Sequence, residues 1–161
     1  MSNLCGLVNI GNTCFMNAAL QLLVSCTVLT KVILTTELEC DKLNIYKKFL
    51  RSYMSQKKIN PKKVKKLFSN KNKIFEGYQQ HDSHEFLISA IDYLEELLND
   101  EYKKKGVSVA GIELSELCSV IFGNKITSII YSNETKEKSK NKITEKILSL
   151  ELPNKYNITF E

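Results

Sequence analysis

Arginine is almost absent from this sequence. Arg51 is the only arginine in 161 residues, so the formal net charge of +5 rests almost entirely on lysine. Lysine-rich helical faces are usually solvated surface, whereas nucleic-acid sites favour the planar, forked guanidinium group of arginine. We therefore expect the positive charge to serve solubility, and we expect no nucleic acid among the partners.

Cysteine pairs of the C-x-x-C type are missing. The five cysteines are scattered along the chain, as Cys5, Cys14, Cys26, Cys40 and Cys118. This spacing suggests neither a zinc knuckle nor a disulfide framework. An odd, scattered set is typical of a reducing compartment. We expect a cytoplasmic or nuclear protein with no metal and no cofactor.

Long apolar runs, repeats and low-complexity tracts are absent as well. The longest apolar run, residues 18–34, is interrupted by polar residues such as Gln21 and Lys31. The N-terminus lacks the basic region, apolar stretch and cleavage site of a leader. We expect no membrane span. With 43% hydrophobic residues, the chain is long enough for one domain or for most of one lobe of a larger domain.

The first predicted helix follows a loop of turn-forming residues. Residues 5–13 are rich in glycine, asparagine and threonine, and they run directly into an apolar stretch from Cys14 to about Cys26. Cys14 therefore lies in the first turn of a helix. Because this helix has almost no polar face, we expect it to be buried on nearly every side.

Three further helices are predicted from caps and apolar spacing. Asp41 can cap the first of them, with an inward stripe of Leu43, Tyr46, Phe49, Leu50 and Tyr53. The second starts at Asn60 and Pro61. Its inward stripe is Val64, Leu67 and Phe68, and its outward face carries a lysine cluster of Lys62, Lys63, Lys65 and Lys66.

The third of these helices opens at Asp82 and stops at Gly106. Asp82 can cap it while Glu85 reaches back three residues later, as in a capping box. Its stripe is Phe86, Leu87, Ala90, Ile91, Leu94, Leu97 and Leu98. After a short apolar piece at 114–122, alternation predicts strands at 125–131 and 146–152, joined by a charged loop at 132–141. A further strand is predicted at 156–160. The order predicts an α+β fold, a helical lobe followed by the start of a sheet.

Cys14 is the candidate nucleophile. The N–H groups and positive dipole end at a helix N-terminus favour a thiolate, which is the attacking form of cysteine. The same N–H groups, with a side-chain amide from Asn9 or Asn12, can stabilise the oxyanion of a tetrahedral intermediate. The alternative is that Cys14 is only a small buried residue at a helix start, and local physics does not decide between the two.

The segment GLVNIGNTCFMNAALQ resembles the cysteine box of the ubiquitin-specific protease family. Twelve adjoining positions, 6–17, fit its pattern G-L-x-N-x-G-N-T-C-[FY]-M-N. The resemblance implies that Cys14 is the nucleophile and Asn9 the oxyanion-hole amide, while 11–13 shape the approach loop. Gln21 also matches a position of the family.

The segment YQQHDSHEFL, residues 78–87, resembles the second box of the same family. The resemblance implies a helix start that lines the groove for the extended ubiquitin tail, with Gln80, Asp82 and Glu85 as substrate-binding residues. The tail ends Arg-Leu-Arg-Gly-Gly, so the Asp82 carboxylate can pair with an arginine or with backbone amides. Asp82 and Glu85 can equally form only a capping box, and both interpretations can hold together.

His81 and His84 are the only histidines. Two histidines without a third ligand make a poor zinc site, and we expect His84 to hydrogen-bond within the lobe instead. Either could be the general base only if its ring approached Cys14 to about 3 Å. The family's base is a histidine in a later palm motif, and no histidine follows His84. We therefore expect the base to lie elsewhere.

The segment CSVIFGNKITSIIYS, residues 118–132, resembles the family's passage from the helical thumb to the fingers. Tyr131, Ser132 and Asn133 stand where a first zinc-binding pair would fall, so zinc is not expected. The resemblance implies the thumb of a papain-like cysteine protease at 1–122 and the start of the fingers sheet at 123–161. The chain would be a partial catalytic domain without its palm.

The function implied by the resemblance is deubiquitination, by thiol-dependent hydrolysis of peptide or isopeptide bonds at the ubiquitin C-terminus. The expected partners are ubiquitin or a ubiquitinated protein. A second polypeptide that supplies the palm and its histidine base is a further possible partner. Three interpretations stay open: a segment of a longer protease, one half of a split protease, and an inactive ubiquitin-binding remnant. An unrelated helical interaction protein is the remote alternative.

Overall fold

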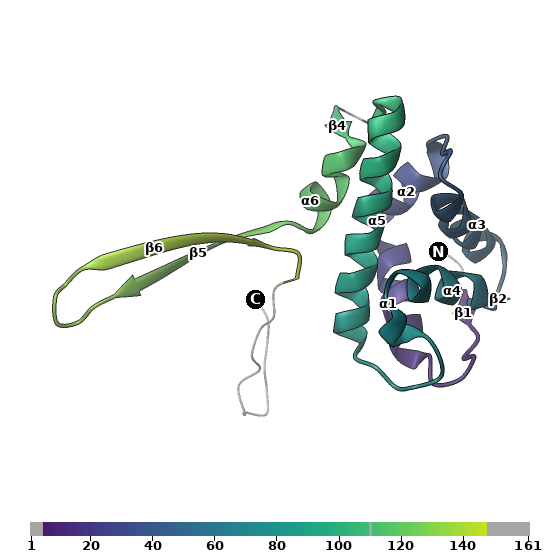
Figure 1. The fold of residues 1–161 in the computed structure, drawn as a ribbon, viewed down its shortest axis with the longest axis horizontal. Coiled ribbons are helices and arrows are strands. Elements are labelled where there is room, and N and C mark those ends of the chain that lie inside the picture. The colour runs from purple at the N-terminus through teal and green to yellow at the C-terminus, as the bar shows by residue number, and fades with distance from the viewer. Residues whose placement is uncertain (1–4, 110, 148–161) are drawn as a thin grey trace. The chain divides into compact units, whose positions relative to one another are not determined.

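The computed structural model describes residues 5–109 and 111–147. It has an α+β fold in which helices dominate and the strands are few (Figure 1). The chain divides into two units, residues 1–121 and 122–161, which are described separately. The division lies one residue before the predicted boundary, and the assignment of the two parts as thumb and fingers stays a prediction.

The first predicted helix is confirmed as α1 (Cys14–Ser25), and a second helix, α2 (Thr27–Thr35), follows directly. The two are bent by 77°. The expectation that α1 is buried on nearly every side is wrong, because Leu22 is 58% exposed and Ala18 also lies on the surface. Its buried side, including Phe15 and Leu20, faces the other helices, and apolar composition alone does not reveal which side that is.

Helix α3 (Asp41–Ser55) buries the whole predicted stripe, from Leu43 to Tyr53. The predicted cap is wrong, because Asp41 is the first residue of the helix and its N-cap, Cys40, makes no side-chain capping bond. A distant residue satisfies the preceding backbone instead. Glu101 is fully buried, and its carboxylate accepts hydrogen bonds from Glu39 N (2.6 Å) and Cys40 N (2.9 Å). This tertiary contact holds the chain just before α3, but it does not bond the first-turn N–H groups that a cap would satisfy.

A short parallel ladder joins the N-terminal segment to the middle of the chain. Strand β1 (Gly6–Leu7) pairs with β2 (Lys58–Ile59), and α4 (Lys62–Lys71) and the 3-10 turn η1 (Lys73–Phe75) follow. The inward stripe of α4 is confirmed. One of its four predicted outward lysines is not simply solvated, because Lys65 Nζ donates to the backbone oxygens of Phe75 (3.2 Å) and Gly77 (2.7 Å).

Helix α5 (Ser83–Lys105) is the longest of the described elements, and it lies between α6 on one side and α1 to α4 on the other (Figure 1). It starts at the Asp82 cap and ends at Gly106, whose φ of 61° fits the left-handed conformation that glycine tolerates. All residues of its predicted stripe are buried except Leu87, which is half-buried. The unit closes with β3 (Ser108–Val109), β4 (Ile112–Glu113), the turn η2 (Leu114–Glu116) and α6 (Leu117–Phe122).

Aromatic rings form the centre of this core. Phe86 of α5 packs edge-to-face against Phe15 of α1, Phe68 of α4 and Phe75 of η1, with ring centroids 5.1–5.7 Å apart. Such contacts add about 0.5–1.5 kcal/mol each beyond the area they bury. Because the cluster joins three helices behind Cys14, it fixes the direction from which α1 presents that residue.

The second unit contains an antiparallel hairpin of β5 (Asn124–Tyr131) and β6 (Lys138–Glu145). The first strand was predicted. The second, β6, begins within the range predicted as a loop and shortens the connection to 132–137. Of the strand predicted at 146–152, only residues 146 and 147 are described, and they are not in a strand. Along β6, lysine alternates with small polar residues, so the strand has almost no hydrophobic pattern. It needs none, because almost every residue of this two-stranded ribbon is solvent-exposed. Residues 148–152 and the strand predicted at 156–160 lie outside the described residues.

No single described helix is long and apolar enough to cross a membrane. The bent pair α1 and α2 passes that test only by length and composition.

Candidate active site

The loop before Cys14 folds around the side chain of Asn9. Asn9 Oδ1 accepts hydrogen bonds from Gly11 N, Thr13 N and Thr13 Oγ1, each at 3.1 Å. Gly11 (φ 104°) and Asn12 (φ 46°) take left-handed conformations that turn the chain back. The loop thereby delivers Cys14 to the first position of α1, where its side chain is exposed.

Thr13 precedes α1 but does not cap it with its side chain. Its buried hydroxyl is already engaged, because it donates to Asn9 and accepts from Ile10 N at 3.1 Å. The first-turn N–H groups of α1 are therefore left without a side-chain cap. Uncapped N–H groups at a helix N-terminus are suited to bind an oxyanion.

The sequence offers two side-chain amides, those of Asn9 and Asn12, as oxyanion donors, and their hydrogen bonds differ in the structure. Asn12 Nδ2 donates to Tyr78 O at 2.9 Å, so that amide is used to join two loops. Among the described residues, Asn9 Nδ2 has no hydrogen-bond partner, and the Asn9 side chain is exposed. Asn9 is the amide left available, and its role as oxyanion donor stays a prediction.

A second loop, residues 76–82, lies against the cysteine loop. Besides the Asn12 bond, Tyr78 packs so closely on Gly11 that a Cβ added there would lie 2.6 Å from a Tyr78 ring carbon. Lys65 holds the start of this second loop through its bond to Gly77 O. The two sequence boxes are thus joined by direct contacts.

Gln80 provides the contact that sequence reasoning missed. Its Nε2 donates to Cys14 Sγ at 3.1 Å across 66 residues of sequence. The sequence marked Gln80 only as a substrate-binding residue. The signal that could have found this contact was the pairing of the two boxes, because a side-chain amide beside a sulfur is a plausible donor to a thiolate.

Asp82 acts as the N-cap of α5. Its Oδ1 accepts from His84 N (2.6 Å) and Glu85 N (3.1 Å). The backbone hydrogen bonds from Glu85 and His84 hold the pKa of Asp82 below its usual value. Within the described part of the chain, Glu85 makes no return bond, so only half of the predicted capping box forms. Asp82 and Glu85 are both exposed.

The two histidines have different surroundings. The ring of His81 meets Phe15 (5.2 Å) and Phe75 (5.4 Å) edge-on, and its buried Nε2 has no partner among the described residues. His84 is exposed, and the expected bond of its ring within the lobe is not present in the described structure. In residues 5–109 and 111–147, Cys14 Sγ is bonded by Gln80 and by neither histidine.

Two other residues of the cysteine box hold the N-terminal segment. Gln21 Nε2 donates to Cys5 O at 2.9 Å, and Gln21 Oε1 accepts from Tyr53 OH. Asn17 Nδ2 lies 3.4 Å from Leu7 O and 3.3 Å from Val8 O. Both side chains therefore fasten the strand before the loop onto α1. Over the same described ranges, no cluster of three His, Cys, Asp or Glu residues could hold a metal.

Comparison with known proteins gives a family match over most of the chain. A family model described as ubiquitin carboxyl-terminal hydrolase matches residues 5–159. The chain is 37% identical to the probable ubiquitin carboxyl-terminal hydrolase 1 of Schizosaccharomyces pombe over 60% of its length. It is 32% identical to ubiquitin carboxyl-terminal hydrolase 1 of Arabidopsis thaliana over 92% of its length, and 32% to Usp2 of Drosophila melanogaster over 66%. It spans only 13%, 14% and 12%, respectively, of these relatives.

Proposed function

Because the chain belongs to the ubiquitin carboxyl-terminal hydrolase family, we propose that it serves deubiquitination, with Cys14 as the nucleophile of a thiol-dependent hydrolysis at the ubiquitin C-terminus. The observation that carries this proposal is the exposed Cys14 side chain at the first position of α1, hydrogen-bonded by Gln80 of the second box. An inert structural cysteine is usually buried among apolar side chains, and Cys14 is not.

The proposed chemistry divides between groups that this chain supplies and one group that we place outside it. The Cys14 thiolate attacks the carbonyl carbon of the scissile bond, and the electron pair of the C=O bond moves to the oxygen. Asn9 Nδ2 and the uncapped N–H groups of α1 stabilise that oxyanion. Collapse of the intermediate breaks the C–N bond and forms a thioester, and the departing amine takes up a proton.

That proton comes from a general acid, the same group that first served as the base for Cys14. General acid–base catalysis of this kind contributes a factor of about 10²–10⁴ in rate. The buried Nε2 of His81 and the exposed His84 are not bonded to Cys14 in the described structure. We therefore assign the base to a histidine outside this chain, either in a continuation of it or in a second polypeptide. The chain's own contribution is the nucleophile, the oxyanion donors and part of the groove.

The substrate groove is proposed to run past the start of α5. Only Oδ1 of Asp82 is used for capping within the described part of the chain, which leaves Oδ2 for an arginine or a backbone amide of the ubiquitin tail. Glu85 is exposed one turn further along. Gln80, which donates to Cys14, is proposed to contact the last residues of the tail as well. We also propose a cytoplasmic or nuclear location for the protein, as its scattered free cysteines suggest.

The alternative is an inactive module that binds ubiquitin without cleaving it. A ubiquitin derivative with a Michael acceptor at its C-terminus separates the two, because addition of the Cys14 sulfur needs no protonation of a leaving amine. We expect slow covalent labelling of the 161-residue chain, lost in Cys14→Ser and retained in the control Cys40→Ser. Labelling that persists in Cys14→Ser would overturn the assignment of the nucleophile.

Cleavage of di-ubiquitin tests the missing base. We expect no detectable hydrolysis by residues 1–161 alone, because the leaving amine receives no proton. Robust hydrolysis that is lost in His81→Ala or His84→Ala would show that the base lies in this chain. Binding of ubiquitin without any labelling of Cys14 would favour the inactive module.

A further inference from the structure

A second concave site lies between α3 and the segment from β2 to α4. It has a volume of ≈ 490 Å³. Helix α3 lines it with Ile45, Lys48, Phe49 and Ser52, which their spacing of i, i+3, i+4 and i+7 places on one face of that helix. The opposite wall comes from residues 56–64. Cys14 and its hydrogen-bond partners do not line this groove.

The floor of the groove is apolar. Phe49 and Ile59 are each 7% exposed and Val64 is 1% exposed, so these three side chains lie deep, where the groove meets the core. Ile45 is half-buried and extends the apolar wall toward the surface. A groove of this size with an apolar floor is suited to a short ligand segment that places a bulky apolar side chain on that floor.

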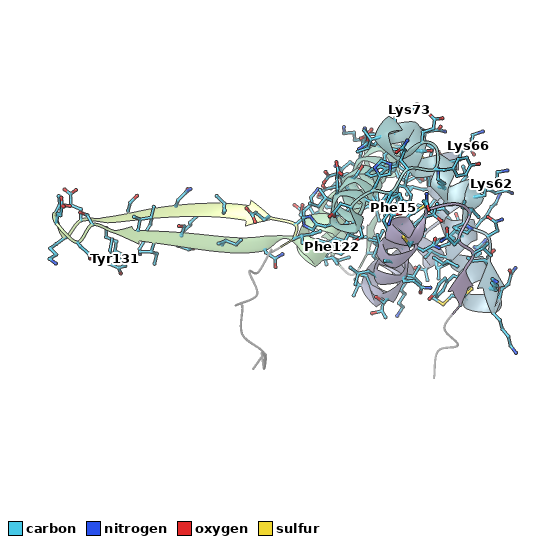
Figure 2. The ribbon with its side chains drawn as sticks, turned by 90° about the horizontal axis from the view of Figure 1, so that it is seen from below. Phe15, Lys62, Lys66, Lys73, Phe122 and Tyr131 are labelled. Carbon is cyan, nitrogen blue, oxygen red and sulfur yellow. The ribbon has the colours of Figure 1, made fainter. Side chains whose placement is uncertain are left out.

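The rim of the groove is positively charged. Lys48, Lys62 and Lys63 line it and are exposed, and no acidic residue lines it. Residues 56–75 contain eight lysines and neither aspartate nor glutamate. Figure 2 shows Lys62 and Lys66 along the same edge of the helical unit.

Internal ion pairs do not neutralise this rim. Of the lysines in α4 and η1, Lys71 pairs with Glu96 and Lys73 with Glu76. In the described part of the chain, Lys62 and Lys63 have no acidic partner. Their positive charge is therefore available to a ligand.

The position of Lys62 and Lys63 is also unfavourable for the helix itself. They occupy the first turn of α4, which contains no acidic residue, although the helix dipole favours negative charge there by about 0.3–1 kcal/mol. An unfavourable local arrangement that no neighbouring group offsets is typical of a functional site. Carboxylates of a ligand would supply the missing negative charge.

We propose that this groove binds an acidic peptide segment of a partner protein. The glutamates or aspartates of the segment contact Lys48, Lys62 and Lys63, and one bulky apolar side chain enters the space over Phe49 and Ile59. Single-stranded nucleic acid fits less well, because it needs exposed aromatic faces for stacking and Phe49 is almost covered. A membrane surface would not fill a concave site.

Fluorescence anisotropy with the 161-residue chain tests the proposal. The probe is a short labelled peptide of glutamates with one central leucine. Lys62→Glu/Lys63→Glu is expected to weaken binding roughly tenfold. The matched control Lys31→Glu/Lys104→Glu makes the same charge change on exposed residues outside the groove and is expected to bind within about twofold of the original chain.

Two changed peptides test each half of the recognition. Replacing the leucine by serine removes the apolar anchor, and replacing the glutamates by glutamines removes the charge, so each is expected to weaken binding. Equal weakening by both double variants would mean a general effect of net charge and would overturn the proposal. An unchanged affinity for the serine peptide would also overturn it, and so would tighter, Lys62- and Lys63-dependent binding of oligouridylate or phosphatidylserine vesicles.

Discussion

At the scale of single residues, the contact between Gln80 and Cys14 links the two sequence boxes. Hydrogen bonds to charged groups contribute more than those between neutral groups, about 1.5–3 kcal/mol against about 1. A donor amide at 3.1 Å from the sulfur is therefore placed to stabilise the negative charge of the attacking sulfur. The direction of the effect follows from charge alone: a neutral donor supports the anion and a carboxylate in its place opposes it.

Gln80→Ala is expected to slow labelling of Cys14 by the ubiquitin Michael acceptor by roughly tenfold, because the sulfur loses its only described donor. Gln80→Glu is expected to slow it further, since a carboxylate then faces the thiolate. Gln79 is an exposed neighbour, and Gln79→Ala is the matched control. The measurement is the second-order labelling rate, and a Gln80→Glu variant as fast as the original chain would contradict the role.

One substitution can separate the observed role of Asn9 in holding its loop from its proposed role as oxyanion donor. Asn9→Asp keeps the oxygen that accepts from Gly11 and Thr13 but removes the Nδ2 donor. We expect a melting temperature close to that of the original chain, and a loss of about 10²–10³ in the rate at which a ubiquitin thioester acylates Cys14. Asn9→Ala should lower both. An acylation rate that Asn9→Asp leaves unchanged would rule out Asn9 as the oxyanion donor.

The sequence placed Cys14 correctly because its local signals agree. Turn-forming residues, an abrupt apolar run and the fit to a known box all indicate the start of a helix at the same residue. The bond from Gln80 was not predictable in that way, since it joins loops 66 residues apart. The same holds for Glu101, whose buried carboxylate binds the backbone before α3, whereas the predicted local cap at Asp41 does not form.

At the scale of elements, the start of α5 depends on one carboxylate. The backbone N–H groups of Glu85 and His84 lower the pKa of Asp82. Because the folded pKa lies below the unfolded value of about 3.9, this stabilisation is fully present above that value. It is lost as the pH falls through the folded pKa.

Asp82→Asn tests this linkage, because asparagine also caps helices but does not titrate. We expect the variant to be nearly as stable as the original chain at pH 7, and its stability to fall less between about pH 4 and pH 2. The measurement is the urea midpoint across that range. Identical pH profiles would show that titration of the Asp82 carboxylate does not affect the stability of the chain.

Asp82→Asn also tests the proposed contact with the substrate. In an enzyme complemented with its palm, this variant should weaken ubiquitin binding if Oδ2 pairs with an arginine of the tail.

The strands show where sequence patterns are weak. β5 falls in the range 125–131 that alternation predicted, and it contains isoleucines at 126, 129 and 130. By contrast, β6 has lysines at 138, 140 and 142 and one isoleucine, Ile143. Both faces of a two-stranded ribbon meet solvent, so neither face requires apolar residues, and the alternation that marks a half-buried strand disappears. The parallel pair β1–β2 is two residues long on each side, too short for any periodicity.

At the scale of the whole molecule, the helical unit leaves apolar surface uncovered. Leu22 of α1 and Val28 of α2 are 58% and 53% exposed. Leu22 lies two turns along α1 from Cys14, with Ala18 between them, on one exposed face of the helix. An apolar helical face left open to solvent favours association. The chain by itself is therefore expected to be marginally soluble.

Leu22→Lys/Val28→Glu is expected to raise the soluble fraction of the expressed chain while its melting temperature changes little, because both side chains are more than half exposed and each new charge suits its end of the helix dipole. The contrasting variant is Leu23→Glu. Leu23 is 1% exposed, so a carboxylate there is buried without a partner and should unfold the lobe. Sedimentation velocity and a thermal melt give the two readouts. A chain that is already monodisperse, and that melts sharply without the double substitution, would show that the exposed face of α1 and α2 needs no cover.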